Sequence, residues 1–281
     1  MIRPMRLEDA GAAHALAVET FEAYARSRNE APEPRPDPVA VRPRYERLAR
    51  SDPGGAWVAE EGGRLTGCAI SILREGVWGL SLFIVHPERQ SAGLGRELLR
   101  RAHDYADGAR GRIILSSRDP RALRAYAGLG LTGHPAFWAS GIARDVAEPE
   151  GVREATPDDL PFLDDVSRHA RGAAHGDDLR TLWEMGATIL LAEGRGFAVT
   201  RGGGPVRLLA AYDDAGAQDV LRAVLARSQG HVAVEWLTAK QAWAVPVCLE
   251  AGLELRTDTG PVFTGGDVGP FAPYLPSGAF L

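Results

Sequence analysis

The sequence predicts an α/β (α+β) protein of two tandem domains, each built on a mixed sheet with helices on both faces. Three observations support this fold class. The stretch IRPMRLEDA at residues 2–10 returns as VREATPDDL at residues 152–160. The order of strand-like and helix-like segments after the first copy is repeated, in a shorter form, after the second. Residues 143–151, ARDVAEPEG, are polar and contain Pro and Gly, as linkers between domains do. We therefore place the first domain at residues 1–146 and the second at residues 151–281.

The first domain opens with a short strand and then a helix, whose acidic start suits the positive end of the helix dipole. A Pro-rich, charged loop is expected at residues 28–44. Residues 55–73 are typical of two strands joined at the Gly62-Gly63 turn, and VWGLSLFIV at residues 77–85 is typical of another strand. The next segment predicts an amphipathic helix whose apolar face consists of Leu94, Leu98, Leu99, Ala102 and Tyr105.

The first domain then continues with a strand at residues 112–118, a helix at residues 119–130 and a strand pair at residues 136–144. The second domain repeats this order. It begins with a strand and a helix with Thr156 as N-cap and Pro157 at the first helical position. A hairpin (187–201), a strand (205–212), a helix (215–228), a strand (231–238) and a helical pattern (240–252) follow. Pro246 should kink or shorten that last helix.

Composition indicates a soluble globular protein, with 45% hydrophobic and 25% charged residues among 281. No run of 18 apolar residues could span a bilayer, and the polar start does not resemble a signal peptide. We therefore expect a cytoplasmic protein that does not act at a membrane. The two cysteines, Cys68 and Cys248, are too few for a disulfide framework and lack metal-site spacing, so we interpret both as core residues and expect no metal.

Charge is distributed unevenly between the two halves. Residues 1–150 contain 21 basic and 20 acidic residues, whereas residues 151–281 contain 11 basic and 17 acidic residues. Neither half has the positive excess that binding to a phosphate backbone requires, so we expect no nucleic-acid partner. The acidic excess of the second half weakly favours a cationic small molecule.

The stretch QSAGLG, Gln90 to Gly95, joins the strand at residues 77–85 to the helix after it, and such a turn is suited to hold an anion. Gly93 and Gly95 would allow positive φ angles and close approach of a ligand to the backbone. A P-loop is excluded because Arg96 and Glu97 follow Gly95 where that motif has Lys and then Ser or Thr. A dinucleotide fingerprint is excluded because Leu98 occupies the place of its third glycine.

The pattern of Val85, Pro87, Gln90, Gly93 and Gly95 resembles the coenzyme A pyrophosphate loop of the GNAT family of N-acetyltransferases. A second block, DPRALRAYAGLGL at residues 119–131, resembles the later motif of that family. There Ala122, Tyr126 and Gly130 match, while Asp119 stands for the usual Asn, Ala125 for Leu and Leu131 for Phe. The resemblance covers residues 1–145 and implies tandem GNAT-like domains, each a mixed, mostly antiparallel twisted sheet flanked by helices.

The resemblance also implies a site for acetyl-CoA as cosubstrate. Backbone groups of Ile84 and Val85 would pair with pantetheine, and an N–H within Leu82 to Ile84 would hold the oxyanion. The amides from Gln90 to Arg96 would face the pyrophosphate. The full set of expected cosubstrate-binding residues is Leu82, Phe83, Ile84, Val85, Gln90, Ser91, Ala92, Gly93, Leu94, Gly95, Arg96, Asp119 and Tyr126.

Tyr126 is the expected general acid for the departing thiolate, because a phenol with a pKa of about 10 is protonated at pH 7. The alternative is an aromatic side chain that only packs. An ionised Asp119 can accept but not donate hydrogen bonds, so its alternative use is as the N-cap of the helix that starts at Pro120. The general base is left open among water held by Ser81 or Ser117, His86, His134 and a water chain.

The second half resembles a degenerate GNAT domain. It has DDAGAQDVL where the pyrophosphate loop should be, and either Cys248 or Glu250, depending on register, where Tyr126 stands in the first half. We read Cys248 as a buried thiol and not as a nucleophile. The domain should complete the fold and shape the cleft for the acceptor. Residues 171–178 and 274–281 would either line that cleft or pack between domains.

These expectations combine into one leading function and two alternatives. The leading function is an acetyl-CoA-dependent N-acetyltransferase, or acyltransferase, acting on a primary amine of a small molecule by direct attack on the thioester. The alternatives are a non-catalytic acyl-CoA-binding or regulatory protein, and a protein or peptide N-acetyltransferase. Whether the chain is a monomer or a homodimer is left open. We expect one cosubstrate per chain, bound in the first half.

Overall fold

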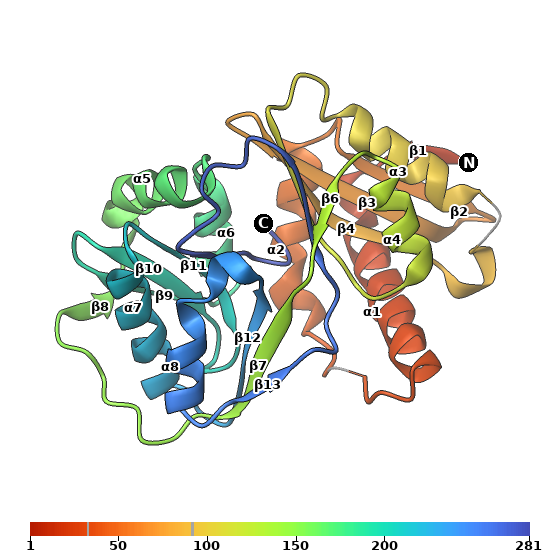
Figure 1. Ribbon diagram of the computed structural model, residues 1–281. Coiled ribbons are helices and arrows are strands. Elements are labelled where there is room, and N and C mark those ends of the chain that lie inside the picture. Colours follow the sequence, from red (N-terminus) through yellow and green to blue (C-terminus); the bar gives the residue numbers. More distant parts are fainter. Residues whose placement is uncertain (33, 91–92) are drawn as a thin grey trace. The chain divides into compact units, whose positions relative to one another are not determined.

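The computed structural model describes residues 1–32, 34–90 and 93–281, which form two compact units (Figure 1). The first unit comprises residues 1–73 and 78–109, and the second comprises residues 74–77 and 110–281. Both contain mixed α/β structure with mostly antiparallel strands, which confirms the predicted fold class. Ser91 and Ala92, two of the expected cosubstrate-binding residues, lie outside the described residues. The domain boundary at residues 146–151 stays a prediction.

The first unit is an antiparallel sheet, in the order β1-β2-β3-β4, with three helices. Every strand predicted from residues 55–85 is present, and Gly62 and Gly63 both have positive φ at the turn between β2 and β3. Its elements are β1 (Ile2–Pro4), α1 (Ala10–Ser27), α2 (Pro38–Ser51), β2 (Ala56–Glu61), β3 (Arg64–Arg74), β4 (Val77–Val85) and α3 (Leu94–Asp104), with short 3-10 turns at Leu7–Asp9 and Pro87–Arg89.

Helix α2 corrects the sequence analysis, which expected a loop through residue 44. The helix begins at Pro38, because Pro38 occupies the first helical position and the Asp37 carboxylate accepts the Val39 N–H at 2.9 Å. Pro43 lies inside the helix, where it removes one backbone hydrogen bond without ending the helix. The dense prolines therefore mark a helix start and not only a loop. Arg44 and Tyr45 belong to α2 as a result.

The second unit contains the remaining elements. The helical pattern at residues 240–252 is divided, and α8 begins two residues before Pro246, so the proline shortens that helix as predicted. The elements are β5 (Gly111–Leu115), α4 (Pro120–Ala127), β6 (Thr132–His134), β7 (Phe137–Ile142), β8 (Val152–Glu154), α5 (Leu160–Arg171), α6 (Asp177–Glu184), β9 (Thr188–Ala192), β10 (Gly196–Thr200), β11 (Val206–Ala211), α7 (Asp214–Ala226), β12 (His231–Leu237), α8 (Ala244–Glu250), β13 (Glu254–Arg256), β14 (Val262–Gly266) and β15 (Tyr274–Leu275), with 3-10 turns at Pro157–Asp159 and Ala239–Gln241.

Strands from the two halves of the sequence exchange places within the second unit. Strand β7 does not pair with β5 or β6. It lies between β12 and β13, antiparallel to both. In return β14, from the end of the chain, lies between β5 and β6 and pairs antiparallel with each of them. A third sheet has the order β15-β11-β10-β9-β8. Each half of the sequence therefore supplies a central strand to the other.

The sequence echo at residues 2–10 and 152–160 corresponds to one repeated ion-pair arrangement. In the first copy both Nη atoms of Arg3 donate to Asp9, at 2.6 and 2.8 Å, and Asp9 accepts the Arg6 N–H. In the second copy Arg153 donates to Asp159 at 2.9 and 2.7 Å, and Asp159 accepts the Thr156 N–H. In both cases the guanidinium holds the pKa of the carboxyl below its usual value.

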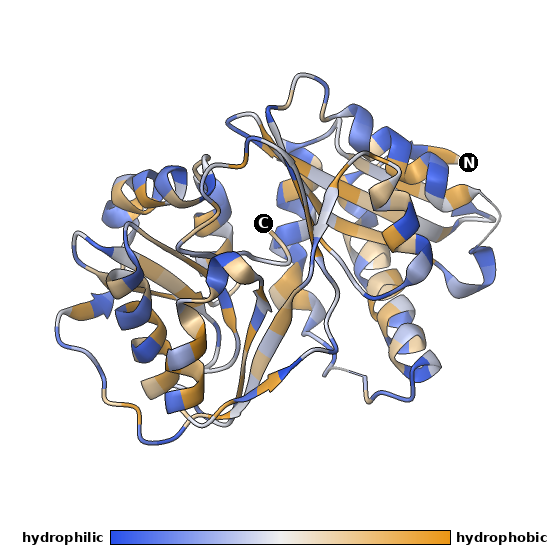
Figure 2. Ribbon diagram, viewed as in Figure 1, coloured by the Kyte–Doolittle hydropathy of each residue, from blue (hydrophilic) through white to orange (hydrophobic). Residues whose placement is uncertain are grey.

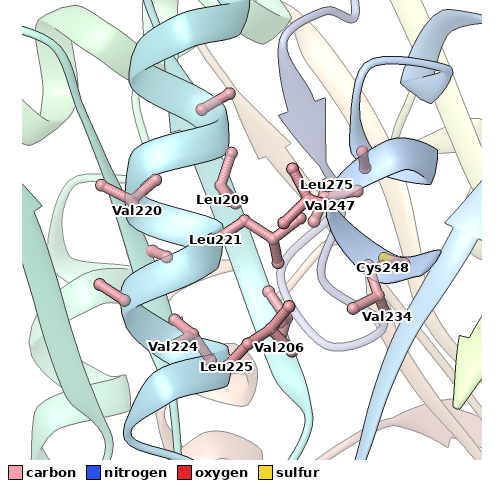
Figure 3. Packing of buried hydrophobic residues seen from close by; sticks show 14 of the residues in the cluster. Val206, Leu209, Val220, Leu221, Val224, Leu225, Val234, Val247, Cys248 and Leu275 are labelled. Carbon is pink, nitrogen blue, oxygen red and sulfur yellow. The ribbon is translucent and has the colours of Figure 1, made fainter. Parts of the chain in front are cut away.

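An apolar cluster of the second unit lies between α7, α8 and the sheets (Figure 3). Figure 3 shows Leu221 of α7 pointing toward Val247 of α8 and Leu275, while Val220 lies on the other side of α7. Strands β9 and β10 have apolar colour along most of their length in Figure 2, in agreement with their burial. No helix within the described ranges combines the length and apolar character needed to cross a membrane.

Candidate functional site

In the first unit, the end of β4 and the start of α3 form the strand–turn–helix segment that the sequence predicted. Leu82, Ile84 and Val85 are buried and Phe83 is partly buried. The His86 N–H donates to the Thr66 carbonyl at 2.9 Å, which extends the ladder by one residue. Gln90 Nε2 then donates to the Val85 carbonyl at 3.0 Å. The Gln90 side chain therefore folds back onto the end of the strand and closes the turn from Val85 to Gln90.

The two glycines of the turn differ in whether the backbone requires glycine. Gly93 has φ +82° and is the N-cap of α3, and no side-chain cap from the described residues reaches this helix start. Gly95 is already helical, so the positive φ that the sequence allowed for both glycines occurs only at Gly93. A Cβ on Gly95 would lie 3.4 Å from Phe83 and Val85. A Cβ at Gly95 would therefore lie at ordinary contact distance from the end of β4, so neither φ nor space requires glycine there.

The first turn of α3 offers backbone donors together with a cation. The first intrahelical bond runs from the Glu97 N–H to the Gly93 carbonyl, so the N–H groups of Leu94, Gly95 and Arg96 precede it. Arg96 is exposed. Arg100 and Arg101 hold the Glu97 carboxylate and lower its pKa to about 2. These features together suit a negatively charged group at the helix start.

The second unit contains Asp119 and Tyr126, at the two ends of α4. Asp119 caps the helix by accepting the Arg121 N–H at 2.9 Å and pairs with the Arg121 side chain at 2.7 Å. The Arg121 bond is the main reason why the pKa of Asp119 is lowered. Tyr126 is 5% exposed, its ring meets that of Phe263 edge-on at 5.6 Å, and burial raises its pKa above the usual value. The phenol therefore stays protonated at neutral pH.

The four candidates for orienting or accepting a proton all form hydrogen bonds. Ser81 accepts from Arg44, and Ser117 accepts the Asp119 N–H at 3.3 Å. His134 Nε2 lies 2.8 Å from the Thr264 hydroxyl. His86 Nδ1 accepts the Glu88 N–H, while its Nε2 lies 3.1 Å from Glu19. This arrangement places the ring proton of neutral His86 on Nε2 and leaves no free lone pair to act as a base.

At the corresponding place in the second half, the first turn of α7 is capped by a side chain. Asp213 lies between β11 and α7, and its carboxylate caps α7 by accepting the Gly216 N–H at 2.6 Å. A second carboxylate, Asp214, is in the first turn. Burial raises the pKa of the Cys248 thiol to about 12, and Glu250 is exposed at the end of α8. A capped, acidic helix start disfavours the anion that the α3 start would suit.

The two loop stretches singled out in the second half lie within the interior of the second unit. Arg171, His175 and Tyr274 are each at most 1% exposed. His175 Nδ1 is 2.9 Å from the Ser167 hydroxyl, and its Nε2 is 3.2 Å from the Tyr274 hydroxyl. Residues 171–178 and 274–281 thus meet in a buried hydrogen-bond network.

Sequence reasoning missed one residue, Arg44 of α2. Its Nη2 donates to the carbonyl and the hydroxyl of Ser81 on β4, at 2.8 and 2.9 Å. Its Nε is buried and has no hydrogen-bond partner among the described residues. One arginine among 31 carries no signal in the sequence, since only the packing of α2 on the sheet distinguishes it from exposed arginines. No group of three or more His, Cys, Asp or Glu side chains among the described residues could hold a metal ion.

Comparisons with known proteins agree with this geometry. The Acetyltransferase (GNAT) family has a model that matches residues 17–131. None of the curated protein sequences compared with the chain matches it. A candidate acetyltransferase of Pyrococcus horikoshii is similar in structure, with TM-score 0.80 and 17% identity over 100% of this chain and 95% of that one.

Two further solved structures are similar over nearly the whole chain. A tandem GNAT protein from the clavulanic acid biosynthesis pathway has TM-score 0.59 and 17% identity, over 95% of this chain and 98% of that one. A GCN5-related N-acetyltransferase from Sphaerobacter thermophilus has TM-score 0.58 and 15% identity, over 96% of each chain. At these identities the likeness concerns the fold.

Proposed function

We propose that the protein is an N-acetyltransferase of the GNAT family with two GNAT-like domains, and that it transfers an acetyl group from acetyl-CoA to a primary amine of a small molecule. The observation that carries the proposal is the start of α3. There a positive-φ glycine, backbone N–H groups and exposed Arg96 stand directly after a buried strand, with no side-chain cap from the described residues.

The proposed chemistry uses residues from both sequence blocks that resemble the family, the one from Val85 to Gly95 and the one at residues 119–131. The pyrophosphate binds at the amides of residues 93–96, and pantetheine pairs with the backbone of Ile84 and Val85. The amine attacks the thioester carbon, a backbone N–H within residues 82–84 holds the oxyanion, and the C–S bond breaks. Tyr126 gives its proton to the departing thiolate, and the proton that the attacking nitrogen loses returns through water to the Tyr126 phenolate. The raised pKa of Tyr126 keeps that proton available at neutral pH.

We also propose that each chain binds one cosubstrate. The support is the contrast between the two helix starts. Helix α3 follows a glycine with positive φ, whereas Asp213 fills the equivalent place before α7. The second domain would then complete the fold and shape the acceptor site.

The test is a thiol-release assay with acetyl-CoA against amino acids, polyamines, aminoglycosides and peptides. Wild type should release thiol with at least one small amine. Tyr126→Phe should lower kcat about 100-fold or more, because a lost general acid typically costs 10²–10⁴. The ring contact with Phe263 should survive this change, so acetyl-CoA binding, measured by calorimetry, should be unchanged. An unchanged kcat would remove Tyr126 from the mechanism.

The same assay separates the alternatives. Tight coenzyme A binding without thiol release across the whole panel would favour a non-catalytic acyl-CoA-binding protein. Release only with peptides would favour a peptide or protein N-acetyltransferase. Gly93→Ala and Asp213→Ala are the variants that test the stoichiometry, since only the first should weaken acetyl-CoA binding.

A further inference from the structure

Arg44 is a buried cation in the first unit, and no described carboxylate neutralises it. Its Nη2 is bonded to Ser81, and its Nε is buried and has no partner among the described residues. The side chains that act electrostatically on its charge are Tyr45 and Cys68, and neither is a carboxylate. By contrast Arg42, two residues earlier on the same helix, is exposed and pairs with Glu46.

A buried arginine without a carboxylate partner lowers the stability of the folded protein when no ligand is bound. A charge moved out of water needs a partner of opposite sign, and a buried charge left without that partner is strongly destabilising. The Ser81 oxygens and the face of the Tyr45 ring, whose centroid lies 5.6 Å from the guanidinium carbon, offset part of that cost. Burial still lowers the pKa of Arg44. A position that served packing alone would be filled better by an apolar side chain.

The surroundings of Arg44 define the charge of the missing partner. His14 on α1 is 8% exposed, and burial, with a smaller effect from Arg44, lowers its pKa, so its ring is neutral at pH 7. Burial raises the pKa of Cys68 to about 12, so that thiol is neutral as well. The Asp9 carboxylate also acts on Cys68, but it is paired with Arg3, so among the described residues Arg44 keeps a positive charge with no carboxylate of its own. It matches a carboxylate, with one negative charge, better than a phosphate monoester, whose charge is about −1.5 to −2 at pH 7.

The position of Arg44 relates it to the proposed reaction. Ser81 directly precedes the segment Leu82–Ile84, in which we place the oxyanion-binding N–H. Strands rise about 3.3 Å per residue, so the Arg44 anchor lies within about 10 Å of that segment along β4. Arg44 is partly exposed as a residue, which leaves a route from solvent to part of the side chain, whereas its unpartnered Nε is buried. A guanidinium is a planar fork of the kind that binds carboxylates.

We propose that Arg44 binds the carboxylate of the acceptor, which is therefore an amino acid carrying its amine and its carboxylate a few bonds apart. This inference rests on the proposed function, because it names the acceptor class of the same site. It replaces the weak expectation of a cationic acceptor with a zwitterionic one. The amine would face the thioester while the carboxylate neutralises Arg44.

The test compares each of the common L-amino acids with its carboxamide in the thiol-release assay. The variants are wild type, Arg44→Gln, Arg44→Lys and, as matched control on the same helix, Arg42→Gln. Wild type should prefer at least one amino acid over its amide by kcat/KM. Arg44→Gln should lower that preference about 30-fold or more, which corresponds to the loss of one buried charge pair. Arg44→Lys should retain part of the preference, and Arg42→Gln all of it.

Binding is measured in parallel, as the shift in Tm that each amino acid or amide causes in the presence of coenzyme A. A Tm shift that amino acids cause and amides do not, and that Arg44→Gln abolishes, supports the carboxylate site. If no amine releases thiol in the same experiments, the proposed transfer reaction is wrong but the carboxylate site stands. Equal kcat/KM for acids and amides in wild type would overturn the inference and leave the transferase intact. Phosphoethanolamine is assayed beside them as the phosphate monoester, and an Arg44-dependent preference for that compound alone would also overturn the inference. Without ligand, Arg44→Gln should not lower Tm, whereas a purely structural arginine would.

Discussion

Asp119 serves the fold at a position where the related motif carries an asparagine. Its carboxylate caps α4 and pairs with Arg121, and these bonds hold it in the ionised state. An ionised carboxylate only accepts hydrogen bonds, so it cannot donate to a pantetheine carbonyl as an amide can. We therefore expect Asp119 to affect cosubstrate binding only through the position of α4.

The capping role predicts how the stability difference between wild type and Asp119→Asn depends on pH. The pKa of Asp119 is lower in the folded protein than its usual value of 3.8. Its charge therefore stabilises the fold above pH 4, and that contribution is lost as the pH falls through the folded-state pKa. The free energies of unfolding in urea should differ most at pH 7 and converge below pH 3.8.

Asp119→Ala is the control for this prediction. It removes the cap itself and should cost about 1 kcal/mol at neutral pH, since alanine offers no acceptor at the helix start. A difference between wild type and Asp119→Asn that stays constant from pH 7 to pH 3 would show that the charge of Asp119 contributes nothing.

At the scale of elements, the turn before α3 predicts different outcomes for its two glycines. Gly93→Ala should lower the free energy of unfolding by about 1–2 kcal/mol, because a side chain at φ +82° is strained even though a Cβ there would contact no atom of the described residues within 4 Å. The same variant should raise KM for acetyl-CoA, since the turn must rearrange. Gly93→Asn should cost less, as asparagine tolerates this conformation.

Gly95→Ala is the matched substitution. Its Cβ would lie at ordinary contact distance from Phe83 and Val85, and alanine favours the helix by up to about 1 kcal/mol. We expect no loss of stability, measured by the same urea unfolding. Equal destabilisation by both substitutions would show that positive φ at Gly93 is not what requires glycine in this turn.

At the scale of the molecule, the exchange of β7 and β14 predicts that the two sequence halves fold poorly alone. A fragment of residues 1–146 lacks β14, so β5 and β6 lose the strand between them. A fragment of residues 147–281 lacks β7, the partner of β12 and β13. Each fragment would expose unpaired strand edges, which promote aggregation.

Co-expression of the two fragments provides the test. We expect each fragment alone to be insoluble or to give an NMR amide spectrum of narrow dispersion, and the pair to co-purify as a folded complex. A fragment 1–146 that is monomeric, soluble and well dispersed would show that the exchanged strand is dispensable. The tandem arrangement would then be two independent domains in series.

The sequence by itself determined the elements and the local motifs. Periodicity located β2, β3, β4 and α3, and the echo at residues 152–160 located the second copy, because strand alternation, helix faces and caps depend on neighbouring residues. The Gln90 to Gly95 motif was recognised for the same reason, and its role as a pyrophosphate turn stays a prediction. Helix α2 was missed in part, since prolines that end one structure can begin another.

Only the tertiary structure decided what depends on partners distant in sequence. The exchange of β7 and β14 is one such feature, because an antiparallel strand of similar composition can pair with either sheet. The isolation of Arg44 is another. Whether an arginine is exposed and paired, like Arg42, or buried without a counter-charge depends on how α2 packs on β4. Burial and the lack of a carboxylate partner among the described residues are properties of the fold, and they make Arg44 a candidate for recognition.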